Sequence, residues 1–104
     1  MNKKAIRQAF RTAVFGRDVC RCRMCGSEDP PLDPHHVVDR NDIPNGGYVV
    51  ENGITLCATC HEKAETFHRT GTAAPGYAPE DLYVKIGSSK EKAFRAAELL
   101  GLLA

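Results

Sequence analysis

The sequence predicts a small α+β domain, with two short strands and a helix at its centre and a further helix at each end. Apolar residues recur with helical spacing near both ends of the chain, whereas short apolar runs bounded by turn residues lie in the middle. Two Cys-x2-Cys pairs enclose that middle region. Because a chain of 104 residues builds only a limited core, we expect residues 1–104 to form a single domain supported by a metal or by disulfides.

The first helix is expected over residues 3–15, where one apolar stripe follows the i, i+3, i+4, i+7 pattern. Asn2 suits the N-cap position, and Gly16 is a candidate for the residue at which the helix ends. The stripe consists of Ile6, Ala9, Phe10, Ala13 and Val14. The basic residues of this segment fall mostly outside the stripe, so the outer face of the helix is expected to be basic.

Positive charge is concentrated in the first quarter of the chain. Residues 1–25 carry seven basic groups and one acidic group, a net charge of +6, whereas residues 26–104 carry a net charge of −5. A basic arm on an acidic body is typical of proteins that bind a polyanion, although a solvated helix face gives the same pattern. The residues expected to contact nucleic acid are Lys3, Lys4, Arg7, Arg11, Arg17, Arg40 and Arg69.

The middle of the chain is expected to supply the two strands and the central helix. In chain order we expect a turn at 20–26, a strand at 35–39, a second strand at 53–56 and a helix at 58–69 that ends at Gly71. In the last third, residues 70–81 form a connector and 83–86 a short strand or extended segment. Ser88 and Glu91 resemble a capping box before a final helix over 90–100, whose apolar side is core or a docking surface.

The chain has no run of about 18 apolar residues that could form a membrane helix. Its first residues are charged throughout and lack the apolar stretch of a secretory signal. We therefore expect a cytoplasmic, reducing location and no membrane partner. In that setting paired cysteines are typically zinc ligands and not disulfides.

Four cysteines have the spacing of a structural zinc site. Cys22 and Cys25 form one pair and Cys57 and Cys60 the other, and a closed shell of four thiolates is typical of structural zinc. The alternative is four unrelated thiols in a small core. The 31 residues between the pairs are more than a simple zinc ribbon needs, so an additional element is expected there. Cys20 is expected to be a small buried apolar residue, although its position also allows it to compete as a ligand.

Three histidines suggest a second metal position. His61 follows Cys60 in the expected helix and is turned about 100° from it, so it is not expected to share the zinc shell. His35 and His36 are adjacent in an expected strand and therefore point to opposite faces. One of them can thus face the helix, where a metal held by His35 and His61 would leave His36 free to accept a proton.

These residues in their sequence contexts resemble the HNH endonucleases, the ββα-metal or His-Me finger group. The resemblance rests on HH at 35–36, on Asn52 and His61 within NGITLCATCH, and on GRDVCRCRMCG before the first cysteine pair, and it covers about residues 10–70. It implies a ββα-metal core at about 20–70, with His36 as general base and His35 and His61 as metal ligands. For Asn52 it implies one of two roles, metal ligation or support of the loop that orients His36.

One position departs from part of that family. Some members carry a further histidine one turn along the helix, where this chain has Glu65. A carboxylate suits hard ions, so the ion is left open among Mg²⁺, Mn²⁺, Ni²⁺ and Zn²⁺. Glu65 and His68 are further candidates for the site, although His68 is expected to be a surface residue.

The resemblance implies an endonuclease or nickase that hydrolyses DNA phosphodiester bonds, with double-stranded DNA of low sequence specificity as its substrate. The alternative is a non-catalytic zinc module that binds nucleic acid or protein, which leaves the histidines unexplained. A redox protein is a weaker alternative because the βαβ pattern is missing. Small free-standing chains of this kind resemble nucleases of phages and mobile elements in bacterial hosts. A homodimer and a protein partner such as phage packaging machinery are open alternatives.

Overall fold

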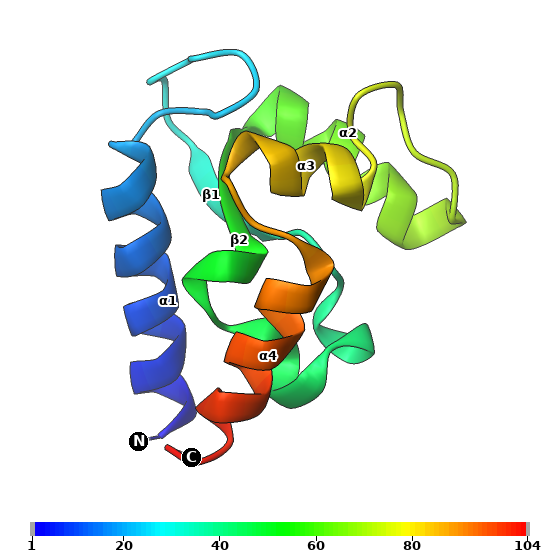
Figure 1. Cartoon of the computed structure of the whole chain (residues 1–104). Coiled ribbons are helices and arrows are strands. Elements are labelled where there is room, and N and C mark those ends of the chain that lie inside the picture. The colour runs from blue at the N-terminus through cyan, green and yellow to red at the C-terminus, as the bar shows by residue number, and fades with distance from the viewer. Residues whose placement is uncertain (1, 104) are drawn as a thin grey trace.

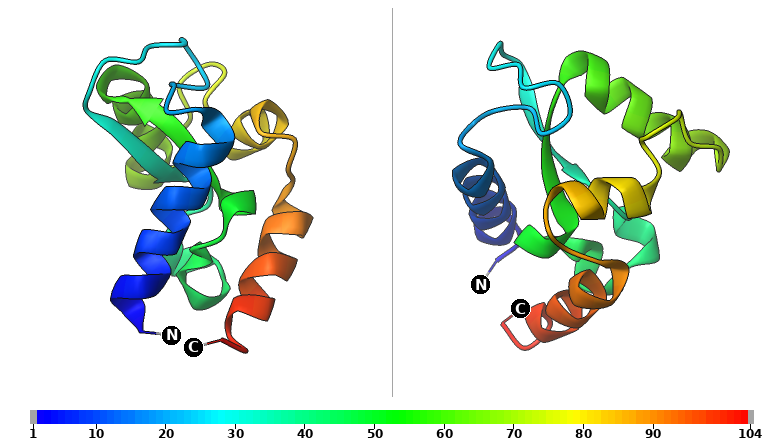
Figure 2. Two further views of the ribbon diagram at one scale, coloured as in Figure 1. Left: turned by 90° about the vertical axis from the view of Figure 1, so that its left-hand side faces the viewer. Right: turned by 45° about the horizontal axis from the view of Figure 1, so that its top comes forward.

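A computed structural model describes residues 2–103. Its elements are α1 (Lys3–Asp18), β1 (Leu32–His36), β2 (Gly53–Cys57), α2 (Ala58–Thr70), α3 (Pro79–Lys85) and α4 (Lys90–Leu100), with three short 3-10 turns between the strands, Arg40–Asp42, Pro44–Gly47 and Val50–Asn52. The strands form an antiparallel two-stranded sheet. Helices α1 and α2 pack against this sheet, and α1 begins at the end of the molecule where α4 ends (Figures 1 and 2). The predicted α+β class with a ββα centre is confirmed.

Helix α1 has the predicted start but extends further than predicted. The Asn2 side chain accepts a hydrogen bond from the Ala5 N–H, as expected of an N-cap. The helix passes through Gly16, whose prediction as the end was wrong, and is capped at Val19 in the left-handed region. The extra turn brings Asp18 into the interior, where its carboxylate accepts a hydrogen bond from the Thr55 N–H. Tertiary contact therefore outweighs the helix-ending tendency of glycine.

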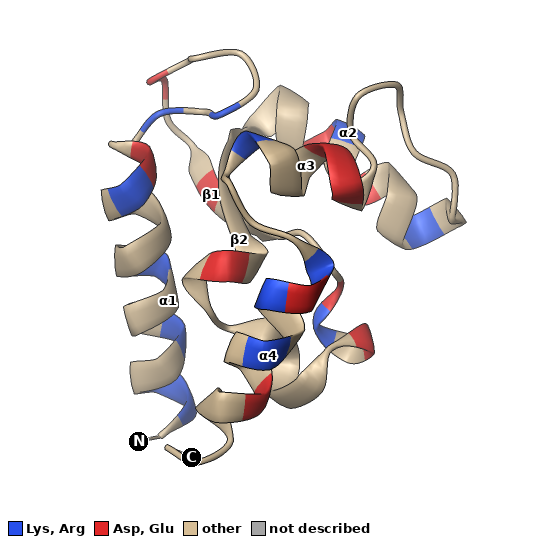
Figure 3. Ribbon diagram, in the orientation of Figure 1, with Lys and Arg blue, Asp and Glu red and all other residues tan. Residues whose placement is uncertain are grey.

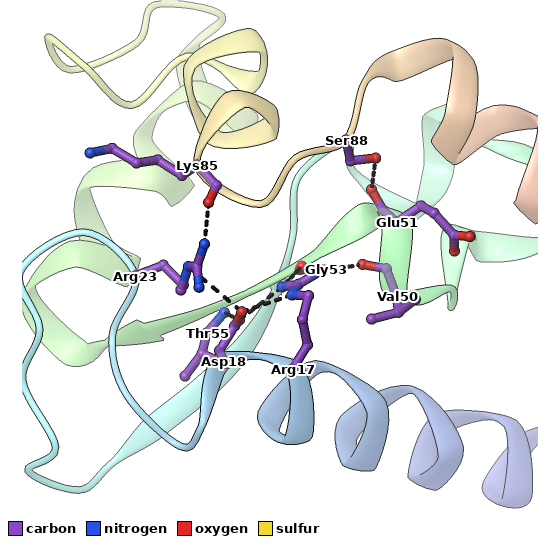
Figure 4. A network of polar contacts seen from close by, with 9 residues as sticks. All are labelled: Arg17, Asp18, Arg23, Val50, Glu51, Gly53, Thr55, Lys85 and Ser88. Carbon is purple, nitrogen blue, oxygen red and sulfur yellow. Dashed lines mark hydrogen bonds and ion pairs between the residues drawn. The ribbon is translucent and has the colours of Figure 1, made fainter.

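A polar network fastens the end of α1 to β2 (Figure 4). The Arg17 guanidinium pairs with Asp18 and also donates to the carbonyl oxygens of Val50 and Gly53. Burial opposes ionisation of Asp18, but the hydrogen bonds from Arg17 and Thr55 outweigh it and hold the pKa of the carboxyl below its ordinary value. Arg17 was expected to contact nucleic acid, and the structure uses its guanidinium inside the protein instead.

Strand β1 lies three residues earlier than predicted. It spans 32–36 and not 35–39, because Val37 and Val38 leave the ladder and bond to Asn52. Pro34 fits within β1 because a strand with one neighbour has a free edge, where a missing N–H is tolerated. Strand β2 agrees with the prediction to within one residue.

Residues 83–86 are not a strand, contrary to the prediction. They belong to α3 and the residue that follows it, where Pro79 occupies the first turn and the Asp81 carboxylate accepts from the Ala78 N–H. Tyr83 is 3% exposed and its neighbour Val84 is 78% exposed, which fits a short amphipathic helix as well as it fits a strand. Pro79 favours the helix, because proline is common in the first turn of helices.

Helix α4 has its predicted bounds but a different cap. Ser89, and not Ser88, accepts from the Lys92 N–H, while the Ser88 hydroxyl donates to the Glu51 carbonyl. Ala93 and Ala97 are buried and belong to the same hydrophobic core as Ile43, Leu56 and Leu82. Cys20 is exposed with a left-handed backbone, so the expectation that it is buried was wrong. No helix within residues 2–103 has the length and apolar character of a membrane span.

Candidate active site

The two cysteine pairs meet where β2 enters α2. The Sγ atoms of Cys22, Cys25, Cys57 and Cys60 lie within 4.8 Å of one another, and those of Cys25 and Cys57 are 3.6 Å apart. Four sulfurs at about 2.3 Å around a tetrahedral zinc are separated by about 3.8 Å, so the spacing suits that ion. All four thiols are free. The cluster therefore has the composition and the spacing to hold a structural zinc ion.

The surroundings of the cluster influence how readily its thiols ionise. Burial opposes ionisation of Cys22, but backbone N–H groups of the two knuckles lower the pKa of its thiol to about 7. Burial raises the pKa of the Cys60 thiol to about 12. The Tyr77 hydroxyl lies 3.3 Å from Cys60 Sγ and can donate to it. Because zinc binds thiolates, these donors favour the form of the site that the metal requires.

A second cluster forms where β1 faces α2. His35 of β1 is 2% exposed, and its Nδ1 lies 3.2 Å from Oε1 of Glu65 in α2. His68, one turn further along α2, stacks on the His35 ring with centroids 5.0 Å apart. One ligand atom from each of His35, Glu65 and His68 lies within 4.8 Å of the others. His68, expected to be a surface residue, is half-buried and contacts His35.

His61 flanks the same cluster. Its Nε2 lies 3.2 Å from Glu65 Oε1, the oxygen that also faces His35. Its Nδ1 lies 3.4 Å from a carboxylate oxygen of Asp33 in β1. Asp33 and His35 share one face of the strand because they are two residues apart. Two elements thus bring the predicted histidine pair and two carboxylates together.

The donor set of this cluster fits a divalent cation. Within residues 2–103, Nε2 of His35 is buried without a hydrogen-bond partner, and the contact of Nδ1 with the Glu65 carboxylate at 3.2 Å is the polar contact of the ring. Burial lowers the pKa of His35, so the ring is kept neutral and able to donate a lone pair. Contact with His35 lowers the pKa of Glu65 to about 2, so its carboxylate is ionised. Imidazole nitrogen with carboxylate oxygen suits several divalent ions.

His36 lies on the opposite face of β1, against aromatic rings. Its imidazole stacks on Phe10 of α1 with centroids 4.7 Å apart, and the Tyr48 ring stands nearly perpendicular to it at the same distance. Burial and the neighbouring His35 lower the pKa of His36 to about 4. The ring is therefore neutral at pH 7 and has a lone pair available for a proton.

The predicted histidines share one cleft of about 360 Å³. His36 lines it together with His35, His61 and Glu65. Its remaining walls are formed by Asp33, Pro34, Asp39, Arg40, Tyr48 and His68. A proton acceptor and a set of metal-binding side chains thus open onto the same space.

Asn52 does not join this cluster, and its amide is used for support. It is fully buried, and its Oδ1 accepts from the Val38 N–H and the Tyr83 hydroxyl. Its Nδ2 donates to the carbonyl oxygens of Val38 and Gly47. The side chain therefore closes the loop that follows His36, with its oxygen already engaged by two donors.

Basic residues of α1 border a groove that meets the cleft. The groove, of about 600 Å³, shares Pro34, His36 and Tyr48 with the cleft. Its other walls are Lys3, Lys4, Arg7, Gln8, Phe10 and Arg11. Figure 3 shows that Lys and Arg recur along the length of α1. Arg40 lines the cleft, whereas Arg69 pairs with Glu62 on α2.

A family model described as HNH endonuclease matches residues 22–67. This segment contains both strands, both cysteine pairs and most of α2. The ββα arrangement and the cysteine cluster of this segment are consistent with an HNH ββα-metal domain, a domain of the nuclease type. Searches of curated proteins and of solved structures found no match.

Several residues around the site were not anticipated from the sequence. Asp33 could have been found, because it lies two positions before His35 in a strand and so shares its face. Tyr48, Tyr77 and Tyr83 gave no signal, because they reach the site from loops or from the misassigned segment at 83–86.

Proposed function

We propose that this chain is a metal-dependent DNA endonuclease or nickase in which His36 is the general base. The observation that carries the proposal is the single cleft shared by His36 and the cluster of His35, His61 and Glu65. The match of residues 22–67 to the HNH endonuclease model supports the reaction class. We also propose that residues 1–104 act as one endonuclease domain, which the radius of gyration of 12.8 Å supports, since about 13 Å is typical of this length.

Each residue of the site has a separate role in the proposed reaction. His36, neutral at pH 7, accepts the proton of the attacking water. His35 and Glu65 would hold the divalent ion, with His61 and His68 beside them, and the ion would stabilise charge on the phosphate and on the departing oxygen. Asn52 supports the loop after His36 and is not assigned as a ligand, because its oxygen is already engaged.

The cysteine cluster has a separate, structural role in this proposal. Zinc held by the two pairs would fix the junction of β2 and α2, from which His61 and Glu65 extend. The α1 groove would hold the phosphate backbone through Lys4, Arg7 and Arg11. Such contacts do not distinguish bases, so low sequence specificity on double-stranded DNA is part of the proposal.

The test is incubation of supercoiled plasmid with the purified protein and Mg²⁺, Mn²⁺, Ni²⁺ or Zn²⁺, with His36→Ala prepared in parallel. Nicked or linear product that disappears with EDTA is expected from the wild type. A general base contributes about 10²–10⁴-fold in rate, so His36→Ala should lose nearly all cleavage while it remains folded and loaded with zinc. Equal cleavage by the variant would remove the assignment. DNA binding without any cleavage would favour a non-catalytic zinc module.

The ligand assignment has its own test. His61→Ala and His68→Ala are each measured for binding of Mn²⁺ or Ni²⁺ by calorimetry. Substitution of the histidine that ligates the ion should lower the metal affinity strongly, and substitution of the other should have a smaller effect. Unchanged affinity in both variants would contradict a metal position between β1 and α2.

A further inference from the structure

Helix α1 lies outside the segment that matches the HNH model, but one of its side chains contacts His36. The ring of Phe10 stacks on the imidazole with centroids 4.7 Å apart and planes inclined by 29°. Phe10 also meets the Tyr48 ring at a centroid distance of 5.6 Å and an angle of 85°. His36, Phe10 and Tyr48 therefore form a closed triangle of rings, because Tyr48 contacts His36 as well.

The sheet contains a gap that admits Phe10. Gly53 is the residue paired with His36 across the two strands, and it has no side chain. A Cβ atom at Gly53 would lie 2.7 Å from Cε1 and 2.8 Å from Cζ of Phe10, far inside van der Waals contact. Phe10 is 4% exposed and occupies the space that a side chain would otherwise fill. The position of its ring is thus fixed by the sheet and not only by α1.

Packing is what orients the His36 ring. Within residues 2–103, its Nε2 is buried and has no hydrogen-bond partner. The backbone carbonyl of His36 faces Nε2 of His68 at 2.9 Å, which fixes the main chain but not the imidazole. The His36 ring is therefore held by its aromatic contacts with Phe10 and Tyr48.

We propose that Phe10 is a positioning residue for the reaction, which keeps the His36 imidazole aligned with the cleft. The inference rests on the proposed function, since it concerns the general base assigned there. It assigns α1 two contributions to the proposed active site. One is the Phe10 ring beside the general base, and the other is the positive charge of the groove. Phe10 itself has no group that exchanges a proton or binds the ion.

The expected effect is on turnover more than on substrate binding. Aromatic pairs of this geometry correspond to about a 2-fold to 12-fold change in an equilibrium or rate when one ring is removed. Phe10→Leu should therefore lower kcat by about that factor. The KM for DNA should change less than twofold, because the basic residues of the groove are retained.

The experiment compares Phe10→Leu and Phe10→Met with Val14→Ala. Val14 is a buried residue of α1 that packs on the same glycine, so this variant controls for loosening of the helix. Kinetics of plasmid nicking are measured at saturating metal, at a temperature where circular dichroism finds each protein folded. In parallel, NMR of the zinc-loaded protein records the ring carbon-bound protons of His36, assigned with His36→Ala. A phenylalanine ring stacked on the imidazole should shift these protons upfield.

The proposal predicts that the His36 ring protons are shifted upfield in the wild type and in Val14→Ala. In both Phe10 variants this upfield shift should disappear and kcat should fall. Unshifted His36 signals in the wild type would overturn it without any variant. A kcat that falls equally in Val14→Ala would also overturn it, because a general loss of packing would then explain the result. A wild type with shifted His36 signals but no metal-dependent cleavage would instead contradict the proposed function.

Discussion

At the scale of single residues, the loop after β1 depends on one buried amide. The Asn52 side chain makes four hydrogen bonds, to both backbone groups of Val38, to the Gly47 carbonyl and to the Tyr83 hydroxyl. Each partner left unsatisfied in the interior costs free energy of its own. A side chain that closes the loop next to the base thus contributes to stability and to geometry together.

Asn52→Ala should lower the free energy of unfolding by about 2–4 kcal/mol, since buried partners lose their hydrogen bonds. Urea unfolding of the zinc-loaded protein measures the change. Ser88→Ala is the matched control, because it removes one hydrogen bond, to the Glu51 carbonyl, and should cost about 1 kcal/mol. Equal losses in the two variants would mean that Asn52 does not support the loop as described.

Asp18 gives a prediction about pH. Its folded-state pKa lies below the ordinary value of 3.8, so the ionised carboxylate stabilises the fold above that pH. This contribution is lost as the pH falls through the folded pKa. Asp18→Asn should cost about 2–4 kcal/mol at pH 7, because a buried charged partner of Arg17 and Arg23 is removed.

The difference in unfolding free energy between wild type and Asp18→Asn should stay constant from pH 7 to about 5 and shrink below about 4. Denaturant titrations of both proteins across this range give the difference, in which the shared effect of acid on the cysteines cancels. A difference that grows toward low pH would have the wrong sign for a carboxyl with a lowered pKa.

At the scale of elements, α1 approaches the sheet at a glycine. A Cβ at Gly53 would lie 2.4 Å from Cγ2 of Val14 and 2.7 Å from Cε1 of Phe10. Helix α1 can therefore reach this position only while residue 53 has no side chain. Gly16 lies on the same helix, but nothing stands within 4 Å of a Cβ added there.

The two glycines should respond to alanine in opposite directions. Gly53→Ala forces α1 and the sheet apart and should destabilise by about 1–3 kcal/mol. Gly16→Ala should stabilise by about 0.5–1 kcal/mol, because it removes backbone freedom from the unfolded chain without a clash. Thermal unfolding distinguishes them. A tolerated Gly53→Ala would mean that α1 does not lie this close to the sheet.

At the scale of the whole molecule, the cysteine cluster joins the first knuckle to β2 and α2. Zinc binding by four cysteines can contribute as much free energy as a domain of this size has in total, about 5–15 kcal/mol. Cys60→Ser should therefore release zinc and abolish the cooperative unfolding transition. Cys20→Ser, at an exposed thiol outside the cluster, should leave both unchanged.

Zinc content by elemental analysis and far-ultraviolet circular dichroism measure the two cysteine variants. One zinc per wild-type chain is expected before any divalent ion is added. A stable, cooperatively folded Cys60→Ser protein would show that the fold does not depend on this cluster.

The distribution of charge also belongs to the whole molecule. The basic residues that border the α1 groove should make DNA affinity fall steeply with salt. Lys4→Gln combined with Arg11→Gln should weaken binding at low salt and reduce the slope of log K against log salt by about 2. Lys92→Gln, at an exposed position of α4, is the control and should change neither. Fluorescence anisotropy at several salt concentrations measures the slopes, and an unchanged slope in the double variant would place the DNA elsewhere.

Much of the fold could be predicted because its signals are local. Apolar spacing and caps identified α1, α2 and α4, and cysteine spacing identified the cluster. The errors arose where local signals are ambiguous. Residues 83–86 are too short a span for their apolar pattern to distinguish helix from strand. Strand β1 ends where the Asn52 side chain accepts a hydrogen bond from the Val38 N–H.

For the candidate site, the sequence by itself determined which chemical groups are available. The types of these residues and their spacing along the chain do not depend on the fold. Only the tertiary structure decided which of them meet. It brought Glu65 and His68 to His35, withdrew Arg17 into an internal network, and placed Phe10 of α1 on His36. The physical reason is that such contacts join segments distant along the chain, and their geometry depends on how closely whole elements can pack.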